Sequence, residues 1–152
     1  MKIAIGCDHA GYELKPYIIK VIEELGHEVI DFGNNDPNDR TDDYPVYGAK
    51  VAHCVADGKA DRGIVLCGTG VGIGITANKV AGIRCVICSD TYSARMSRQH
   101  NDANILAMGA RVVGRELAMD IARIWLETGF EGDRHARRVE MIARVERGED
   151  LS

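Results

Sequence analysis

Regular alternation of short apolar runs with amphipathic segments is the feature that most constrains how this chain folds. Strands are predicted for five apolar runs, at residues 2–6, 28–32, 63–67, 83–88 and 105–108. Helices are predicted at residues 14–25, from Pro45 to about 58, from the end of a 68–74 loop to about 79, and at 91–100, 117–128 and 134–146. Repeated strand–helix units form a parallel sheet covered by helices on both faces. The sequence therefore predicts an α/β fold, a three-layer α/β/α Rossmann-like arrangement with a five-stranded parallel sheet.

Size and charge narrow the classes of protein to which the chain can belong. Its 152 residues fit a single domain spanning 1–152. A net charge of −4 disfavours a broadly basic surface, so we expect no nucleic-acid partner. Since no apolar run approaches the roughly 18–20 residues that cross a bilayer, we expect no membrane partner. The first residues run straight into a strand-like pattern and do not resemble a signal peptide, so we expect a cytoplasmic protein.

Five cysteines, an odd number without a secretion signal, predict free thiols. Cys85 and Cys88 have CxxC spacing, but they lie in a predicted strand, where positions three apart face opposite sides of the sheet. A thiol redox protein is therefore an alternative that the pattern disfavours. The five histidines show no HExxH or related ligand spacing, and we predict no metal and no cofactor.

Polar and reactive residues follow the predicted strands. Open parallel sheets bind ligands beyond the carboxyl ends of their strands, so these positions are the first places to look for chemistry. Asp8 and His9 follow the first strand, Cys67 ends the third and begins a glycine-rich loop, and Arg111 follows the fifth. His100 and Asn101 come after the helix that follows the fourth strand. We expect this whole set to gather at one site.

The loop that begins at Cys67 matches neither the Walker A pattern nor GxGxxG. It does place flexible N–H groups at a helix start, which can stabilise an anion, although a tight strand–helix turn explains the same glycines. Cys67 lies beside the predicted start of a helix, where the thiolate form of a cysteine is favoured. From its position alone, Cys67 could equally be an inert cysteine buried in a strand. No Asp or Glu occurs from residue 62 to 89, so Cys67 is the one candidate base beside this loop.

Arg134 and Arg138 are four residues apart on a predicted helix and share a face. Paired guanidinium groups suit phosphate oxygens, whereas most charge runs are solvated helix faces. By itself this pair is a weak indication of phosphate binding.

Several ordered stretches together resemble the type B ribose-5-phosphate isomerases of the ribose/galactose isomerase family. They cover nearly the whole chain: GCDHAG at 6–11, RTDDYP at 40–45, CGTGVG at 67–72, ANK at 77–79, SRQHND at 97–102, and GDRH at 132–135 followed by Arg138. The resemblance implies the strand order 2-1-3-5-4. The Asp42–Asp43 doublet is one residue longer than the family pattern, which leaves the place of Tyr44 open.

The resemblance also implies roles for individual residues. Cys67 would be the base that moves a proton between C1 and C2, His100 would help to open the furanose ring, and Thr69 would assist. Asp8 would contact sugar hydroxyls. The enediolate would be held by Asn101 and the amides of Gly68, Thr69, Gly70, Val71 and Gly72. The phosphate would be held by His9, Arg111, Arg134 and Arg138.

The implied activity is interconversion of ribose 5-phosphate and ribulose 5-phosphate in the non-oxidative pentose phosphate pathway, without metal or cofactor. The small-molecule partner is thus a sugar phosphate. The family forms homodimers and sometimes tetramers with shared active sites, and the helix at 134–147 would pack on its own domain or on a partner subunit. Two alternatives stay open: isomerisation of a six-carbon sugar phosphate, such as allose 6-phosphate or galactose 6-phosphate, and a non-catalytic phosphosugar-binding module.

Overall fold

The computed structural model describes all 152 residues. Its main body is a parallel sheet between two layers of helices. The strands are β1 (Lys2–Cys7), β2 (Glu28–Asp31), β3 (Arg62–Cys67), β4 (Cys85–Ile87) and β5 (Ile105–Gly109). They lie in the order β2-β1-β3-β5-β4 and every pairing is parallel. The predicted fold class and strand order are confirmed. The three central strands are almost wholly apolar and buried, as expected for a sheet covered on both faces.

Six helices connect and follow the strands. They are α1 (Lys15–Glu24), α2 (Tyr44–Ala56), α3 (Val71–Ala77), α4 (Thr91–Gln99), α5 (Arg115–Glu127) and α6 (Asp133–Glu146). Pro16 lies in the first turn of α1, where its missing N–H breaks no helical hydrogen bond. The glycine-rich loop is shorter than predicted because α3 already begins at Val71, directly after Gly70 in a left-handed conformation.

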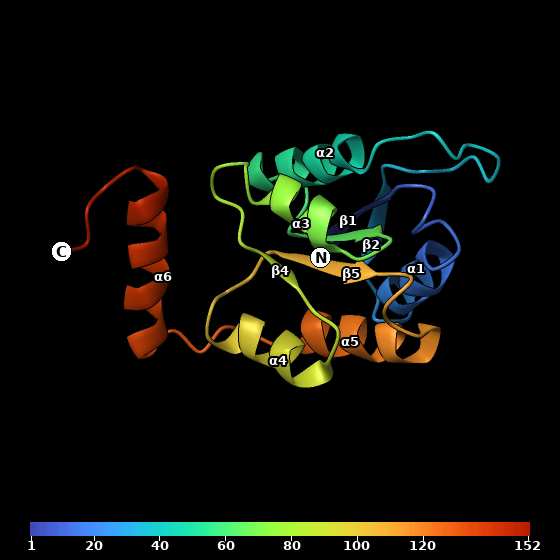
Figure 1. The fold of residues 1–152 in the computed structure, drawn as a ribbon. Helices are drawn as coiled ribbons and strands as arrows, with labels where there is room; N and C mark the ends of the chain where they lie inside the picture. The colour runs from blue at the N-terminus through green and yellow to red at the C-terminus, as the bar shows by residue number, and fades with distance from the viewer.

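Two apolar cores lie on opposite faces of the sheet. One core packs β-strand residues against α1, α4 and α5, and the other packs them against α2 and α3 (Figure 1). Cys85 belongs to the second core and Cys88 to the first. The prediction that these two cysteines face opposite sides is therefore confirmed, and all five cysteines are free.

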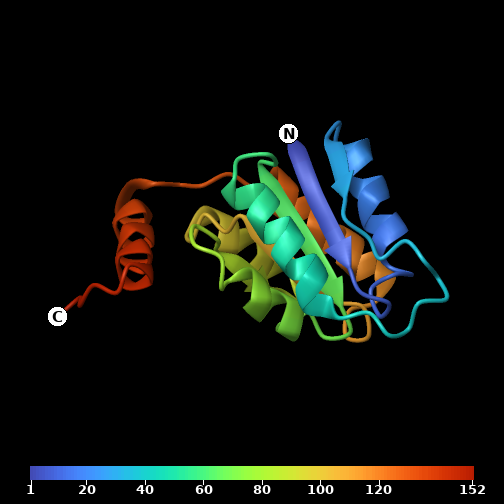
Figure 2. The ribbon, with the colours of Figure 1, turned by 90° about the horizontal axis from the view of Figure 1, so that it is seen from above.

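Helix α6 departs from the layered arrangement. Both ribbon views show it standing clear of the two helical layers, joined to α5 by a short connection (Figures 1 and 2). Its described links to the rest of the chain are a hydrogen bond from the Gly82 N–H to Glu146 Oε2, at 3.0 Å, and a contact of His135 with His100. The helix does not cover the sheet of its own chain. No helix of this chain has the length and apolar character needed to traverse a bilayer.

Candidate functional site

The carboxyl edge of the sheet, where the strands end, gathers half of the predicted site. Cys67 ends β3 beside Gly109, which ends β5, and β1 ends at Cys7 next to Leu66. Asp8, His9, Cys67, the 68–72 loop and Arg111 therefore meet at one place, and we call them the Cys67 cluster. Parallel strands bring these segments together because all their carboxyl ends lie at the same edge.

Cys67 is the best-placed nucleophile or base of this cluster. Its Sγ accepts a hydrogen bond from the Gly70 N–H, at 3.1 Å, and an N–H directed at sulfur stabilises negative charge there. Burial raises the pKa of Cys7 and Cys85 to about 12 and that of Cys88 to about 11. Burial also raises the pKa of Cys54, so these four thiols are held in the neutral form. Cys67 differs from them because the Gly70 N–H donates to its sulfur.

The loop after Cys67 is pressed against its neighbours. Gly70 has φ +79°, and a Cβ there would lie 2.8 Å from the carbonyl carbon of Met108. A Cβ on Gly72 would lie 2.6 Å from the ring of Tyr44. The position of Tyr44, which the sequence left open, is thus against the loop. No group in the chain accepts a hydrogen bond from the N–H of Gly68, Thr69 or Gly72, so these donors can face a ligand.

Asp8 and Thr69 make local hydrogen bonds that shape the cluster. Asp8 Oδ1 accepts from the N–H groups of Ala10, at 3.0 Å, and Gly11, at 3.2 Å, and the side chain is buried. Thr69 Oγ1 accepts from the Val71 N–H at 3.2 Å while Thr69 itself is exposed. Both residues thus order their own turns and still present an oxygen atom at the carboxyl edge.

His9 is held by a residue that the sequence did not single out. Asp42 Oδ1 accepts from the backbone N–H of His9, at 3.1 Å, and also contacts its Nδ1, while Oδ2 accepts from Asn34 Nδ2 at 2.9 Å. Burial opposes ionisation of Asp42, but the hydrogen bonds from His9 and Asn34 outweigh it and lower the pKa of the carboxyl. The two adjacent aspartates therefore differ in their contacts. Asp42 orients His9, whereas Asp43 occupies the N-cap position of α2 and its side chain makes no capping hydrogen bond.

A cavity of about 730 Å³ opens beside the Cys67 cluster. Among its walls are His9 and Arg111, together with Tyr12, Arg40 and Arg115, to which the sequence analysis assigned no role. The Arg111 guanidinium lies against Gly68, where a Cβ would be 3.3 Å from Nη1. Arg111 thus lies next to the glycine-rich loop, where a guanidinium suits an anionic group. The rest of the lining carries both signs of charge, since Glu13, Asp36 and Asp39 face the same cavity.

His100 and Asn101 do not lie at this edge, and here the expected gathering is wrong for a single chain. Helix α4 starts after β4 and runs back along the sheet, so its end lies beside the residues that precede β4 and β5. Arg84 Nε donates to the Asn101 carbonyl oxygen at 3.0 Å, directly before β4 begins. The five residues of β5, at about 3.3 Å each, then separate this amino edge from Cys67 by roughly 16 Å.

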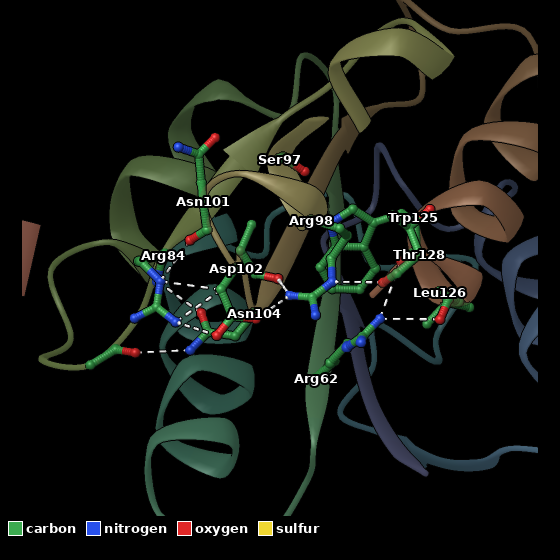
Figure 3. Close-up of polar contacts among 12 residues, drawn as sticks. Arg62, Arg84, Ser97, Arg98, Asn101, Asp102, Asn104, Trp125, Leu126 and Thr128 are labelled. Carbon is green, nitrogen blue, oxygen red and sulfur yellow. Dashed lines mark hydrogen bonds and ion pairs between the residues drawn. The ribbon is translucent and has the colours of Figure 1, made fainter. Parts of the chain in front are cut away.

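The amino edge carries its own polar framework (Figure 3). Asp102, at φ +46°, pairs with Arg98 at 2.9 Å and with Arg84 at 3.4 Å. Arg98 is almost fully buried and also donates to the carbonyl oxygens of Ala103 and Thr128. The Asn101 amide points away from this network in Figure 3 and makes no side-chain hydrogen bond within the chain. The framework therefore fixes the backbone of 100–102, while the side chains of His100 and Asn101 lie outside this network of hydrogen bonds.

Arg134 and Arg138 lie at the same end of the molecule as His100. Both are exposed on α6, with no ion pair in the chain, and their neighbour His135 stacks on His100 with ring centroids 4.1 Å apart. We call His100, Asn101, Arg134 and Arg138 the His100 cluster. One chain thus presents two groups of predicted site residues at opposite edges of its sheet.

Comparisons with known proteins agree with this architecture. The Ribose/Galactose Isomerase family model matches residues 3–142. Ribose-5-phosphate isomerase B of Escherichia coli is 57% identical over 145 residues, covering 95% of this chain and 96% of that protein. D-erythrulose-4-phosphate isomerase of Pectobacterium atrosepticum is 46% identical, covering 98% and 97%. The structure of Clostridium thermocellum ribose-5-phosphate isomerase B superposes with a TM-score of 0.93 at 55% identity, covering 97% and 99%. By sequence and by structure, this chain belongs to the ribose/galactose isomerase family.

Proposed function

We propose that this protein interconverts D-ribose 5-phosphate and D-ribulose 5-phosphate, with Cys67 as the base. The observation that carries the proposal is the Cys67 sulfur, which ends β3, accepts the Gly70 N–H and lies beside unpaired backbone donors. The similarity of the whole chain to ribose-5-phosphate isomerase B from two bacteria supports the choice of substrate. The reaction belongs to the non-oxidative pentose phosphate pathway, and the proposal places the enzyme in the cytoplasm.

The chemistry follows from these groups. Isomerisation removes a weakly acidic proton beside a carbonyl, so it needs a base, donors for the enediolate oxygens and a grip on the substrate. The Cys67 thiolate takes the C2 proton of the open aldose and returns a proton to C1. The free N–H groups of the 68–72 loop stabilise the enediolate, with Thr69 beside them. Asp8 binds sugar hydroxyls, and His9 and Arg111 hold the phosphate at a distance from the reacting carbons.

We propose further that two copies of the chain complete each site. His100 and Asn101 of one subunit, with Arg134 and Arg138 on α6, would face the Cys67 cluster of the other. The separation of the two clusters within one chain supports this arrangement, because neither half has both a base and a group to open the ring. Exposed apolar residues beside the edge strand β4 offer a surface for association: Val71, Ile75, Ile87 and Tyr92. Helix α6 likewise exposes Ile142 and Val145.

The base is tested by steady-state kinetics of the wild type and Cys67→Ala, each first shown to be folded. We expect turnover of ribose 5-phosphate by the wild type and its loss in the variant. Turnover that survives in Cys67→Ala rules out Cys67 as the base. Wild-type turnover of erythrulose 4-phosphate, allose 6-phosphate or galactose 6-phosphate in place of ribose 5-phosphate would reassign the substrate. The first is the substrate in the name of the Pectobacterium relative. Binding without turnover would indicate a phosphosugar-binding module.

Sharing of the site is tested by mixing two inactive proteins, Cys67→Ala and His100→Asn, under conditions that exchange subunits. A mixed dimer then contains one site with both native residues and one with neither. Random exchange makes half of the dimers mixed, so about a quarter of wild-type activity should return. Activity that stays at zero in verified mixed dimers would mean that each site draws both residues from one chain.

A further inference from the structure

His100 is surrounded by two groups that the proposed reaction does not yet use. The ring of His135 stacks on it, with centroids 4.1 Å apart and planes 10° from parallel. The Glu131 carboxylate reaches both rings, since its Oε2 lies 4.0 Å from His100 Nε2 and 3.5 Å from His135 Nε2. Two residues that lie more than thirty positions after His100 thus converge on the imidazole that would open the sugar ring.

The backbone holds this group in place. The Glu131 N–H donates to the carbonyl oxygen of Gln99, at 3.1 Å, which ties the connection before α6 to the end of α4. Gly132, at φ +70°, then turns the chain so that α6 begins at Asp133 and His135 falls in its first turn. Arg84 and Arg98 fix the 100–102 backbone from the other side. The stack is therefore a built contact, because each of its members is anchored through its own main chain.

The side chains of His100, Glu131 and His135 differ in exposure, since His135 is buried and the other two reach solvent. The His135 side chain is only 6% exposed, and its Nε2 has no hydrogen-bond partner. Burial, then the neighbouring His100 and Arg134, lower the pKa of His135, with Arg138 acting in the same direction and Glu131 opposing them. His135 is therefore held neutral, whereas His100, with its side chain 37% exposed, reaches the surface. The Glu131 carboxylate therefore lies beside one buried ring and one ring that reaches the surface.

The same three residues lie at the spacing of metal ligands, with their donor atoms within 4.8 Å of one another. Parallel stacked rings nevertheless oppose an ion. Imidazole lone pairs lie in the ring plane, so an ion between two stacked rings would sit well out of both planes, unlike a tetrahedral zinc site. The geometry suits a pair of rings that support each other and a carboxylate that polarises them.

We propose that Glu131 and His135 are positioning residues that hold the His100 imidazole in one orientation and keep its proton available to the furanose ring oxygen. This inference rests on the proposed isomerase function. Ring opening breaks the C1–O4 bond, releases the proton of the C1 hydroxyl and places a proton on O4. The products are the open aldehyde and a C4 hydroxyl, and no oxidant or reductant takes part. The Glu131 carboxylate stabilises the imidazolium that donates the proton, and the His135 ring prevents His100 from rotating away.

The test compares Glu131→Gln, which keeps size and loses charge, with His135→Phe, which keeps an aromatic face and loses the nitrogens. Glu149→Gln is the control, because Glu149 is an exposed acid paired with Arg144 and Arg147. Each protein is assayed for kcat on ribose 5-phosphate. Each is also titrated with an acyclic four-carbon phosphohydroxamate that imitates the enediolate and needs no ring opening. In Glu131→Gln and His135→Phe we expect kcat to fall about tenfold or more while hydroxamate affinity stays within about twofold.

Nitrogen-15 NMR of the histidine-labelled protein observes the His100 imidazole directly and does not depend on enzymatic activity. In Glu131→Gln and His135→Phe, we expect the His100 ring signals to shift or broaden, because the imidazole is no longer held in one orientation. Unchanged kcat in both variants, or loss of hydroxamate binding in parallel with kcat, would overturn the inference. If the wild type itself does not turn over ribose 5-phosphate, the proposed function fails. The NMR spectra then decide alone, and unaltered His100 ring signals in both variants overturn the positioning role.

Discussion

The two edges of the sheet achieve order by different physical means. At the carboxyl edge, the Cys67 cluster is shaped by backbone: glycines, N–H groups and short turns lie so close together that side chains would not fit. At the amino edge, the His100 cluster is shaped by side chains: the buried Arg98, the half-buried Arg84, an aspartate in a left-handed conformation and a stacked histidine pair. The first edge is a direct consequence of parallel strands, and the second has to be built by long-range polar contacts.

The amino edge should be most sensitive to loss of Arg98. Arg98→Met removes hydrogen bonds to Asp102, Ala103 and Thr128 and the guanidinium packed 5.8 Å from the Trp125 ring centre. Because buried carbonyl oxygens lose their donor, we expect the free energy of unfolding to fall by about 3 kcal/mol or more. Urea denaturation measures this change. Arg95→Met, an exposed arginine on the same helix, should stay within about 0.5 kcal/mol. Equal effects of the two substitutions would show that the framework does not stabilise this edge.

The carboxyl edge should respond to added bulk instead. Gly70→Ala meets the Met108 backbone at 2.8 Å and an unfavourable φ of +79°, so the loop has to shift. We expect kcat to fall about a hundredfold, because displacement of about 1 Å can misplace the groups around Cys67 that much. Gly58→Ala is the matched control, since Gly58 has φ +70° and open space around its Cβ position. It should lose some stability and keep its activity. Full activity in Gly70→Ala would contradict the importance of the tight loop.

The contact between Asp42 and His9 is a long-range side-chain contact at the carboxyl edge, of the kind that otherwise shapes the amino edge. Asp42→Asn removes the charge that holds His9, and a hydrogen bond to a charged group contributes about 1.5–3 kcal/mol. We expect KM for ribose 5-phosphate to rise about tenfold with a smaller change in kcat. Asp43→Asn, beside it at the start of α2, should leave KM unchanged. A similar KM in both variants would mean that His9 does not need Asp42 for phosphate binding.

The smallest expected effect is a two-stage loss of stability in acid, one stage from each edge. The pKa of His135 lies below its ordinary 6.5, so its contribution is complete above pH 6.5 and is lost as pH falls below that value. The pKa of Asp42 lies below 3.8, so its contribution is lost only in stronger acid. Thermal unfolding across pH 3–8 should show both stages. Burial also lowers the pKa of His27, which contributes to the same upper stage, so His135→Phe should weaken that stage and leave the lower one unchanged. An upper stage of undiminished size in His135→Phe would assign it to His27 instead.

Much of the fold followed from local pattern. Strand and helix periods and Pro16 in a first turn are set by neighbouring residues, so the five strands and the placement of Cys67 at a strand end could be predicted. The glycine-rich loop was predicted to end at residue 74 and ends at Gly70. The strand order came from family resemblance, since pairing between distant strands leaves no local signal. Motifs also pointed to His100 and Arg134, yet they carried no information about the edge at which each lies.

The contacts missed from the sequence join residues far apart in the chain. Asp42 reaches His9 across 33 positions, and the stacking of His135 on His100 depends on where α4 ends and how the chain turns at Gly132. The metal-ligand spacing of His100, Glu131 and His135 likewise appears only after folding.

The sequence by itself determined an α/β chain with Cys67, the proposed base, at a strand end, because hydrophobic period and turn residues act over a few positions. Tertiary structure alone decided that His100 lies about one strand length from Cys67, because α4 must run back across the sheet to connect parallel strands. That reversal divides the site residues of one chain between two edges.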